Sequence, residues 1–213
     1  DTQSFQKYKA VDVSPIDSLY SMPFRLKKEI TIDFGEHLTG YFSFSVRSTG
    51  LAADGPLRFK LTFGEVPSEV AVSFDSYKEG LSRAWLQDEV VSVMYVPQTV
   101  TLSRRLAFRY VKIELLGSSP YYDFNIHDMK CMAQTSAKNI PEELPQAVDP
   151  MIRKIDRVGL NTLKECMQTV YEDGPKRDQR LWIGDLYLEA LGNNYSYKQH
   201  LSLIHIYEPT RRS

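Results

Sequence analysis

Apolar and polar residues alternate with a period of two in several runs between Phe24 and Ala133. Such alternation places one set of side chains on a buried face and the other set in water, as in a strand of a half-exposed sheet. Gly, Pro and Asp separate the runs and favour turns between successive strands. The pattern therefore predicts an antiparallel β-sandwich of the jelly-roll type. The clearest runs are Ile30/Ile32/Phe34, Phe42/Phe44/Val46, Leu57/Phe59/Leu61/Phe63, Val111/Ile113/Leu115 and Tyr122/Phe124/Ile126.

A helical pattern replaces the alternation in the last third of the chain. Residues 135–148 are polar, contain two prolines, and are predicted to form a linker. Asp149 suits the N-cap of a helix and Pro150 its first position, because the missing amide hydrogen of proline costs nothing there. The predicted apolar stripe, at steps of mostly three and four residues, is Met151, Ile155, Val158, Thr162, Met167 and Val170.

Two helices are predicted to form a hairpin in this region. Gly174-Pro175 is expected to end the first helix. A second, shorter helix is predicted from about Trp182 to Leu191, with Gly192-Asn193-Asn194 as its stop. The stripe of the first helix is wide, which suits a helix that packs on several neighbours.

These patterns predict a mainly β chain of five segments. Residues 1–22 are interpreted as the exit from an absent upstream domain, and residues 23–134 as the β-sandwich domain. The linker, residues 135–148, leads into a helical segment, residues 149–200. Residues 201–213 resemble the translation of a transposon-end adapter used in sequencing libraries, with one mismatch at Tyr207. We expect this tail to carry no biology, so His205 and Arg211-Arg212 are not interpreted as ligands or signals.

Charge and composition exclude several classes of function. The 26 basic residues nearly balance the 27 acidic ones, so no net field steers the chain toward nucleic acid or anionic lipid. No apolar run is long enough to span a bilayer, and no membrane partner is expected. Cys131 and Cys166 lie far apart in apolar patterns and are predicted to be buried thiols, not a zinc site or a disulfide framework. His37, His127 and His200 lack metal-ligand spacing, so neither a metal nor a cofactor is expected.

One short charged segment carries most of the chemical information. Residues 173–185 hold three carboxylates, three cations, a tryptophan and two glycines between the two predicted helices. Clustered acids beside an aromatic ring suit a sugar-cleaving site, because carboxyls exchange protons and a flat apolar face stacks on a pyranose. Chemistry alone favours a plainer interpretation, a solvated and salt-bridged turn between helices, because most charged loops are inert.

The same segment resembles the start of the catalytic domain of bacterial alpha-L-rhamnosidases, glycoside hydrolase family seventy-eight. The usual pattern there reads Asp-Cys-Pro-Gln-Arg-Asp-Glu-Arg-Leu-Gly-Trp-Thr-Gly-Asp. With one glycine before the tryptophan taken as deleted, the matching residues are Asp173, Pro175, Arg177, Asp178, Arg180, Leu181, Trp182, Gly184 and Asp185. Residues 30–36 with Gly40-Tyr41, and residues 108–111, resemble the β-sandwich domain that precedes the family's barrel. Several motifs in the family's order are more specific than any one alone.

The resemblance implies a role for each residue of the charged segment. Asp173 and Arg177 would hold sugar hydroxyls, and Trp182 would stack on the sugar; the plainer alternatives are a helix end, an ion pair and a core tryptophan. The family's general acid is a glutamate at the position of Gln179, and an amide cannot release a proton near neutral pH. The acid role would then pass to Asp178 or Asp185, unless the substrate differs or the site is dead. Asp185 lies at the start of the second helix, whose dipole favours the ionised form, so we prefer Asp178 as the acid.

The resemblance implies an inverting hydrolase that removes terminal rhamnose or a related sugar. In this interpretation the chain is a β-sandwich followed by the first hairpin of a truncated (α/α)6 barrel, and it lacks the catalytic base. We therefore expect it to be inactive alone, and to aggregate or leave the residues after Pro150 mobile. The alternatives are a non-catalytic carbohydrate-binding or scaffold module, and another glycosidase or phosphorylase on the same barrel. The sequence leaves the compartment open, and we lean to a periplasmic or secreted location.

Overall fold

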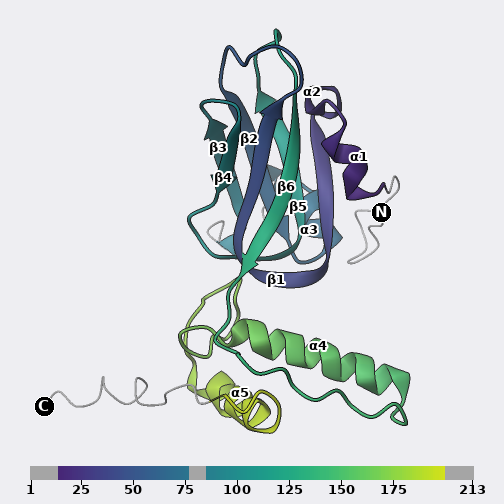
Figure 1. Ribbon diagram of the computed structural model, residues 1–213. Coiled ribbons are helices and arrows are strands. Elements are labelled where there is room, and N and C mark those ends of the chain that lie inside the picture. The colour runs from purple at the N-terminus through teal and green to yellow at the C-terminus, as the bar shows by residue number, and fades with distance from the viewer. Residues whose placement is uncertain (1–13, 77–84, 200–213) are drawn as a thin grey trace, which may run out of the picture. The chain divides into compact units, whose positions relative to one another are not determined.

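The computed structural model describes residues 14–76 and 85–199. The chain divides into two compact units, with the boundary between Ala133 and Gln134. We call them the β unit and the helical unit (Figure 1). Residues 1–22, predicted as the exit from another domain, are described from residue 14 only, and His200 and the tail 201–213 lie outside the described residues.

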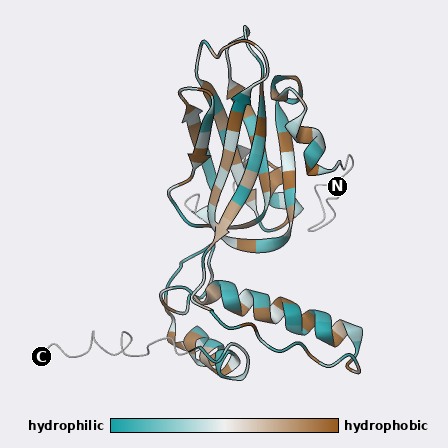
Figure 2. Ribbon diagram, viewed as in Figure 1, coloured by the Kyte–Doolittle hydropathy of each residue, from teal (hydrophilic) through white to brown (hydrophobic). Residues whose placement is uncertain are grey.

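In the described part of the β unit, six strands form one antiparallel sheet. The strand order is β3-β2-β5-β1-β4, and β6 pairs with β1. Apolar residues recur along the strands, as the alternation predicts (Figure 2). The elements are α1 (Ile16–Tyr20), α2 (Phe24–Lys27), β1 (Glu29–Ser48), β2 (Leu57–Gly64), α3 (Pro67–Ala71), a 3-10 turn (Phe74–Ser76), β3 (Asp88–Val93), β4 (Gln98–Thr101), β5 (Leu106–Gly117) and β6 (Phe124–Ala133).

The long strand β1 turns the single sheet into two facing parts. Its first half pairs with β5, from Glu29 opposite Glu114 to Gly40 opposite Leu106. Its second half pairs with β6 along Gly40–Ser48 and with β4 along Ser43–Val46. Figure 1 shows β1 curving round the end of the sheet between these two halves. Period-two alternation predicts two strands here, at residues 30–34 and 42–46, and the structure joins them into one.

Two glycines make this curvature possible. Gly35 has φ +83°, in the left-handed region that side chains disfavour, and the register of β1 against β5 shifts between Asp33 and Leu38. A Cβ built on Gly40 would lie 2.2 Å from the carbonyl oxygen of Met132. The backbone of β6 therefore passes too close to Gly40 for any side chain there.

An ion pair between Asp33 of β1 and Arg109 of β5 lies at the bend. The Arg109 guanidinium donates two hydrogen bonds to Asp33, from Nε to Oδ1 at 2.8 Å and from Nη2 to Oδ2 at 2.9 Å. These bonds hold the pKa of the Asp33 carboxyl below its usual range. Asp33 also accepts the amide of Gly35 at 2.7 Å. The two upstream segments that carry the family resemblance thus meet at this bend, where they shape the sheet.

The core of the β unit is built from phenylalanines that lie between the two parts of the sheet. Phe42 and Phe63 have ring centroids 5.4 Å apart, and Phe44 and Phe59 have centroids 5.8 Å apart. Since β1 and β2 do not pair with each other, these contacts cross from one part of the sheet to the other. Phe24 of α2 is fully buried against Phe59 as well, so the segment before β1 contributes to this core.

The helical unit contains α4 (Pro150–Cys166) and α5 (Ile183–Tyr195). Asp149 caps α4 as predicted, and its Oδ1 accepts the amide of Met151 at 2.7 Å. The predicted C-terminal ends of the two helices are both wrong. The first helix ends at Cys166, because the amide of Glu172 returns to the carbonyl of Cys166 at 2.9 Å and the chain reverses there. Within the described residues, no helix is long and apolar enough to cross a membrane.

The second helix continues through the glycine that was predicted to stop it. A Cβ on Gly192 would lie 3.2 Å from Cδ2 of Leu163, so the glycine allows α5 to approach α4 closely. Asn193 is buried, and its amide nitrogen donates to the Tyr171 hydroxyl at 2.8 Å and to the carbonyl of Gln199 at 2.6 Å. The helix therefore ends only after Tyr195, where Asn193 secures the following turn.

Candidate active site

The candidate site begins where α4 ends and the chain reverses. Met167 and Tyr171 form an isolated antiparallel bridge, and both are buried. The carboxyl-bearing Glu172 is also buried, with only 4% of its surface exposed. The reversal therefore turns the first residues of the charged segment back toward the end of α4.

Asp173 closes the base of a loop that contains Arg177 and Asp178, two of the five predicted site residues. Its amide donates to the carbonyl of Arg180 at 3.0 Å, and its Oδ1 accepts the amide of Arg180 at 3.1 Å. These two bonds join residues seven positions apart. These bonds thus hold residues 174–179 as a compact turn that begins after Asp173.

The tip of this loop has an unusual backbone. Asp178 and Gln179 both have positive φ, at 63° and 53°. The Gln179 side-chain amide donates to the carbonyl of Pro175 at 2.7 Å, and its backbone amide donates to the carbonyl of Arg177 at 2.8 Å. An ionised glutamate at position 179 would place an acceptor against the Pro175 carbonyl, which cannot donate. The departure from the family pattern thus has a structural use in this turn.

Asp178 is the more sheltered member of an ion pair at the loop tip. Its Oδ1 lies 3.8 Å from Nε of Arg177, and 28% of the Asp178 side chain is exposed against 56% of Arg177. Trp182 is the N-cap residue of α5 and is half exposed. Asp185 lies in the first turn of α5, where the helix dipole favours a negative charge.

One functional candidate was missed by the sequence reasoning. Burial, followed by the charges of Asp185, Asp173 and Glu172, raises the pKa of Glu189 to about 7, although a hydrogen bond with Cys166 opposes the shift. Burial also raises the pKa of the Cys166 thiol to about 12, so it remains protonated. The sequence signal was the four-residue step from Asp185 to Glu189, which places both on one face of α5.

The structure brings some of the predicted residues together and leaves others apart. The charges of Asp173 and Asp185 both raise the pKa of Glu189, so these two carboxylates lie near the same side chain. Arg177 pairs with Asp178 at the exposed loop tip. Within residues 14–76 and 85–199, no group of three or more His, Cys, Asp or Glu side chains is placed to hold a metal.

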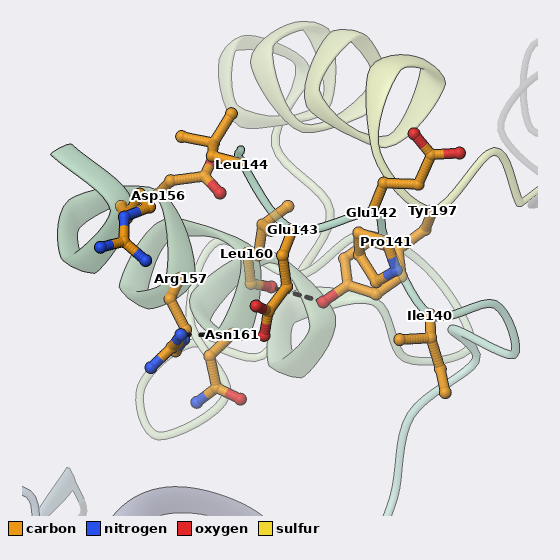
Figure 3. Close-up of a pocket in the computed structure, with 11 residues that line it drawn as sticks. Ile140, Pro141, Glu142, Glu143, Leu144, Asp156, Arg157, Leu160, Asn161 and Tyr197 are labelled. Carbon is orange, nitrogen blue, oxygen red and sulfur yellow. Dashed lines mark hydrogen bonds and ion pairs between the residues drawn. The ribbon is translucent and has the colours of Figure 1, made fainter. Parts of the chain in front are cut away.

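Two hollows of the helical unit lie elsewhere. They are about 230 and 850 Å³ in volume and are lined by residues 139–144, one face of α4 and the segment around Tyr197. Figure 3 shows the smaller one, where Glu143 faces Arg157 at 3.7 Å and the Tyr197 hydroxyl donates to the carbonyl of Leu160 at 2.8 Å. None of the five predicted site residues lines either hollow.

Comparison with protein families gives one match, which covers residues 1–133. The matching model is described as the glycosyl hydrolase family 78 alpha-rhamnosidase N-terminal domain. It covers more than half of the chain and includes both segments at the bend of β1. Among curated proteins no match is found.

Solved structures extend the likeness beyond the β unit. A rhamnosidase from Klebsiella oxytoca with rhamnose bound is 37% identical, has a TM-score of 0.85, and matches 94% of this chain and 39% of its own. A family 78 rhamnosidase of Bacillus sp. GL1 is 20% identical with a TM-score of 0.64, over 83% of this chain and 17% of its own. An alpha-L-rhamnosidase from Dictyoglomus thermophilum is 19% identical with a TM-score of 0.54, over 79% and 18%. The last two show the fold alone, and this chain spans about two fifths of the first relative.

Proposed function

We propose a function from the premise that this chain belongs to the alpha-rhamnosidases of glycosyl hydrolase family 78. It is part of a hydrolase that removes terminal rhamnose, or a closely related sugar, from a larger glycoside. The observation that carries the proposal is the 37% identity, over 94% of this chain, to a rhamnosidase that was solved with rhamnose bound.

In this proposal the two units have different tasks. The β unit is a scaffold, and α4 and α5 are the first hairpin of an (α/α)6 barrel that surrounds the sugar. A match over 94% of the chain extends well past residue 133, which supports a shared helical segment. The exposed apolar residues of α4, Met151, Ile152, Ile155 and Val158, suit a helix with further barrel neighbours.

The charged segment supplies one wall of the proposed site. Asp178 is the proposed general acid, and Asp185 is its alternative. Asp173 and Arg177 bind sugar hydroxyls, and Trp182 offers its exposed ring for stacking on the pyranose. The sheltered side chain of Asp178 beside Arg177 supports this choice, because the guanidinium can orient the carboxyl toward the leaving oxygen.

The proposed mechanism inverts the anomeric carbon. Asp178 protonates the oxygen of the departing group while a second carboxylate removes a proton from water on the opposite face of the ring. Inverting enzymes separate these carboxyls by about 6.5–9.5 Å to admit the water. We place the base in barrel helices outside these 213 residues, so the chain alone is expected to bind sugar weakly and not to turn over.

A second candidate function has one observation in its favour. The Gln179 amide is fixed by the Pro175 carbonyl within the turn, so the position that carries the acid in the family serves structure here. A non-catalytic carbohydrate-binding or scaffold module needs no general acid at this position. It predicts sugar binding without cleavage, whatever sequence is joined to this chain.

The decisive experiment uses this chain extended with the downstream segments of the Klebsiella relative. Hydrolysis of a rhamnose-containing disaccharide and of an aryl rhamnoside is measured for the parent, Asp178→Asn and Asp185→Asn, with Lys154→Ala on α4 as matched control. We expect Asp178→Asn to lose about 10²–10⁴-fold in rate on a disaccharide and much less on an aryl glycoside, whose good leaving group needs no proton. Early product with inverted configuration by NMR supports inversion; binding without any turnover supports the module instead.

A further inference from the structure

Glu189 lies in the middle of a polar stripe on α5 that faces the chain reversal. Asp185, Glu189 and Asn193 follow at steps of four residues, which places them on one side of the helix. Asn193 is buried and donates to the hydroxyl of Tyr171 at 2.8 Å, so this side is turned toward the segment after α4. Asp185 is exposed at one end of this stripe, whereas Glu189 is partly buried and Asn193 is buried. The inward face of a helix is usually apolar, so these two polar residues require a reason.

The surroundings of Glu189 suit a neutral carboxyl better than a charged one. Its Oε2 is fully buried and has no hydrogen-bond partner. The Glu189 carboxyl also forms a hydrogen bond with the Cys166 thiol, which is a weak donor. The charges that act on Glu189 come from Asp185 on its own helix and from Asp173 and Glu172 on the reversal, and all three are negative. A buried carboxylate oxygen without a donor costs far more free energy than a buried carboxylic acid.

We infer that Glu189 is a positioning residue that holds a proton between α5 and the reversal, and so keeps Asp173 and Asp185 on one wall. The inference rests on the proposed function only in assigning those two carboxylates to a sugar site. With the proton bound, the contact buries one neutral acid among three carboxylates. Without it, four negative groups from two segments repel one another, and α5 separates from the segment that carries Asp173.

The direction of the pH effect follows from the raised pKa. An unfolded glutamate releases its proton near 4.5, whereas Glu189 in the fold releases it near 7. Between these values the folded state binds more protons than the unfolded state, so stability falls as pH rises. The contact is fully stabilised below about pH 4.5 and loses this contribution as pH passes through about 7. Such a pH profile separates a proton-holding role from simple packing.

The test is a carbon-13 titration of the glutamate carboxyls of this chain from pH 4 to 9, with Glu189 assigned by its absence in Glu189→Gln. We expect a midpoint near 7 for Glu189. The protection of α5 amides against hydrogen exchange should fall by about 10-fold or more between pH 5 and 8. Solvent around the partly buried Glu189 keeps this effect small. Glu189→Gln keeps the size and neutral charge of the protonated acid and should remove this fall. Glu142→Gln, a change at an exposed glutamate, should leave it in place.

Two results would overturn the inference. One is a midpoint for Glu189 near that of the exposed glutamates. The other is an exchange profile for Glu189→Gln with the same pH step as the parent chain. Neither measurement uses a rhamnoside, so the failure of sugar cleavage by the extended protein leaves the proton result readable. Equally, cleavage with an ordinary Glu189 would retain the proposed function and reject the positioning role.

Discussion

Both units leave large apolar side chains in water, but the β unit also buries many of them in one core, whereas the helical unit buries only a few. Among the described residues of the β unit, seven phenylalanines are fully buried and form most of its core. On α5 the exposed set is Ile183, Tyr187, Leu188, Leu191 and Tyr195, and four apolar residues of α4 are exposed as well. The contrast indicates that the sheet is stabilised by a large core, and that the helices depend on a small cluster around Met167, Tyr171 and Tyr197 and on local hydrogen bonds such as the cap of α4.

The largest effect should come from emptying the β core. Phe42→Ala removes a fully buried ring that contacts Phe44, Phe63 and Phe108, and we expect the free energy of unfolding to fall by about 3–5 kcal/mol. Tyr187→Ala on α5 is the matched aromatic truncation; its side chain is 67% exposed, so its cost should stay within about 0.5 kcal/mol. Urea unfolding of both variants measures the difference. Equal costs would contradict the contrast between the two units.

The next effect concerns the close crossing at the bend of β1. Gly40→Ala places a methyl group 2.2 Å from the Met132 carbonyl, and the strands must separate to admit it. We expect a loss of about 1–3 kcal/mol, in the range of overpacked cores. Gly50→Ala serves as control, because a Cβ at that position meets nothing within 4 Å. Thermal unfolding of the two variants decides the matter, and a tolerated alanine at position 40 would mean that β6 does not cross there.

The difference between the units also explains what the sequence could predict. Alternation identified β1, β2, β5 and β6, because one set of side chains in each is more buried than the other. It could not identify the bend, since two short alternating runs and one long curved strand have the same period. The strands β3 (Asp88–Val93) and β4 (Gln98–Thr101) were missed because they are short and mostly half exposed. The alternation therefore predicted that the alternating segments are strands, but it could not predict that two of them belong to the single strand β1.

The helix ends and the site were harder, because they depend on contacts between distant residues. Met167 and Val170 continue the helical spacing, yet α4 ends at Cys166, and the bridge from Met167 to Tyr171 reverses the chain there. Gly192 looked like a stop, and its small size instead serves packing against Leu163. Motif resemblance named Asp173 and Asp185 as candidates. It could not find Glu189, whose raised pKa arises from burial and from neighbours on two segments.

The smallest effect tests whether α4 depends on its cap. Asp149→Ala removes the acceptor for the Met151 amide, and caps of this kind contribute about 1 kcal/mol. Because α4 buries little of its apolar stripe, this loss should raise the exchange rate of amides in the first turns of α4 about 5-fold, while β1 and β5 remain unchanged. Lys154→Ala, an exposed change within the same helix, should leave those rates nearly the same. If Asp149→Ala instead lowered the protection of the β strands equally, the two units would unfold together, and the independence argued for the β unit would be wrong.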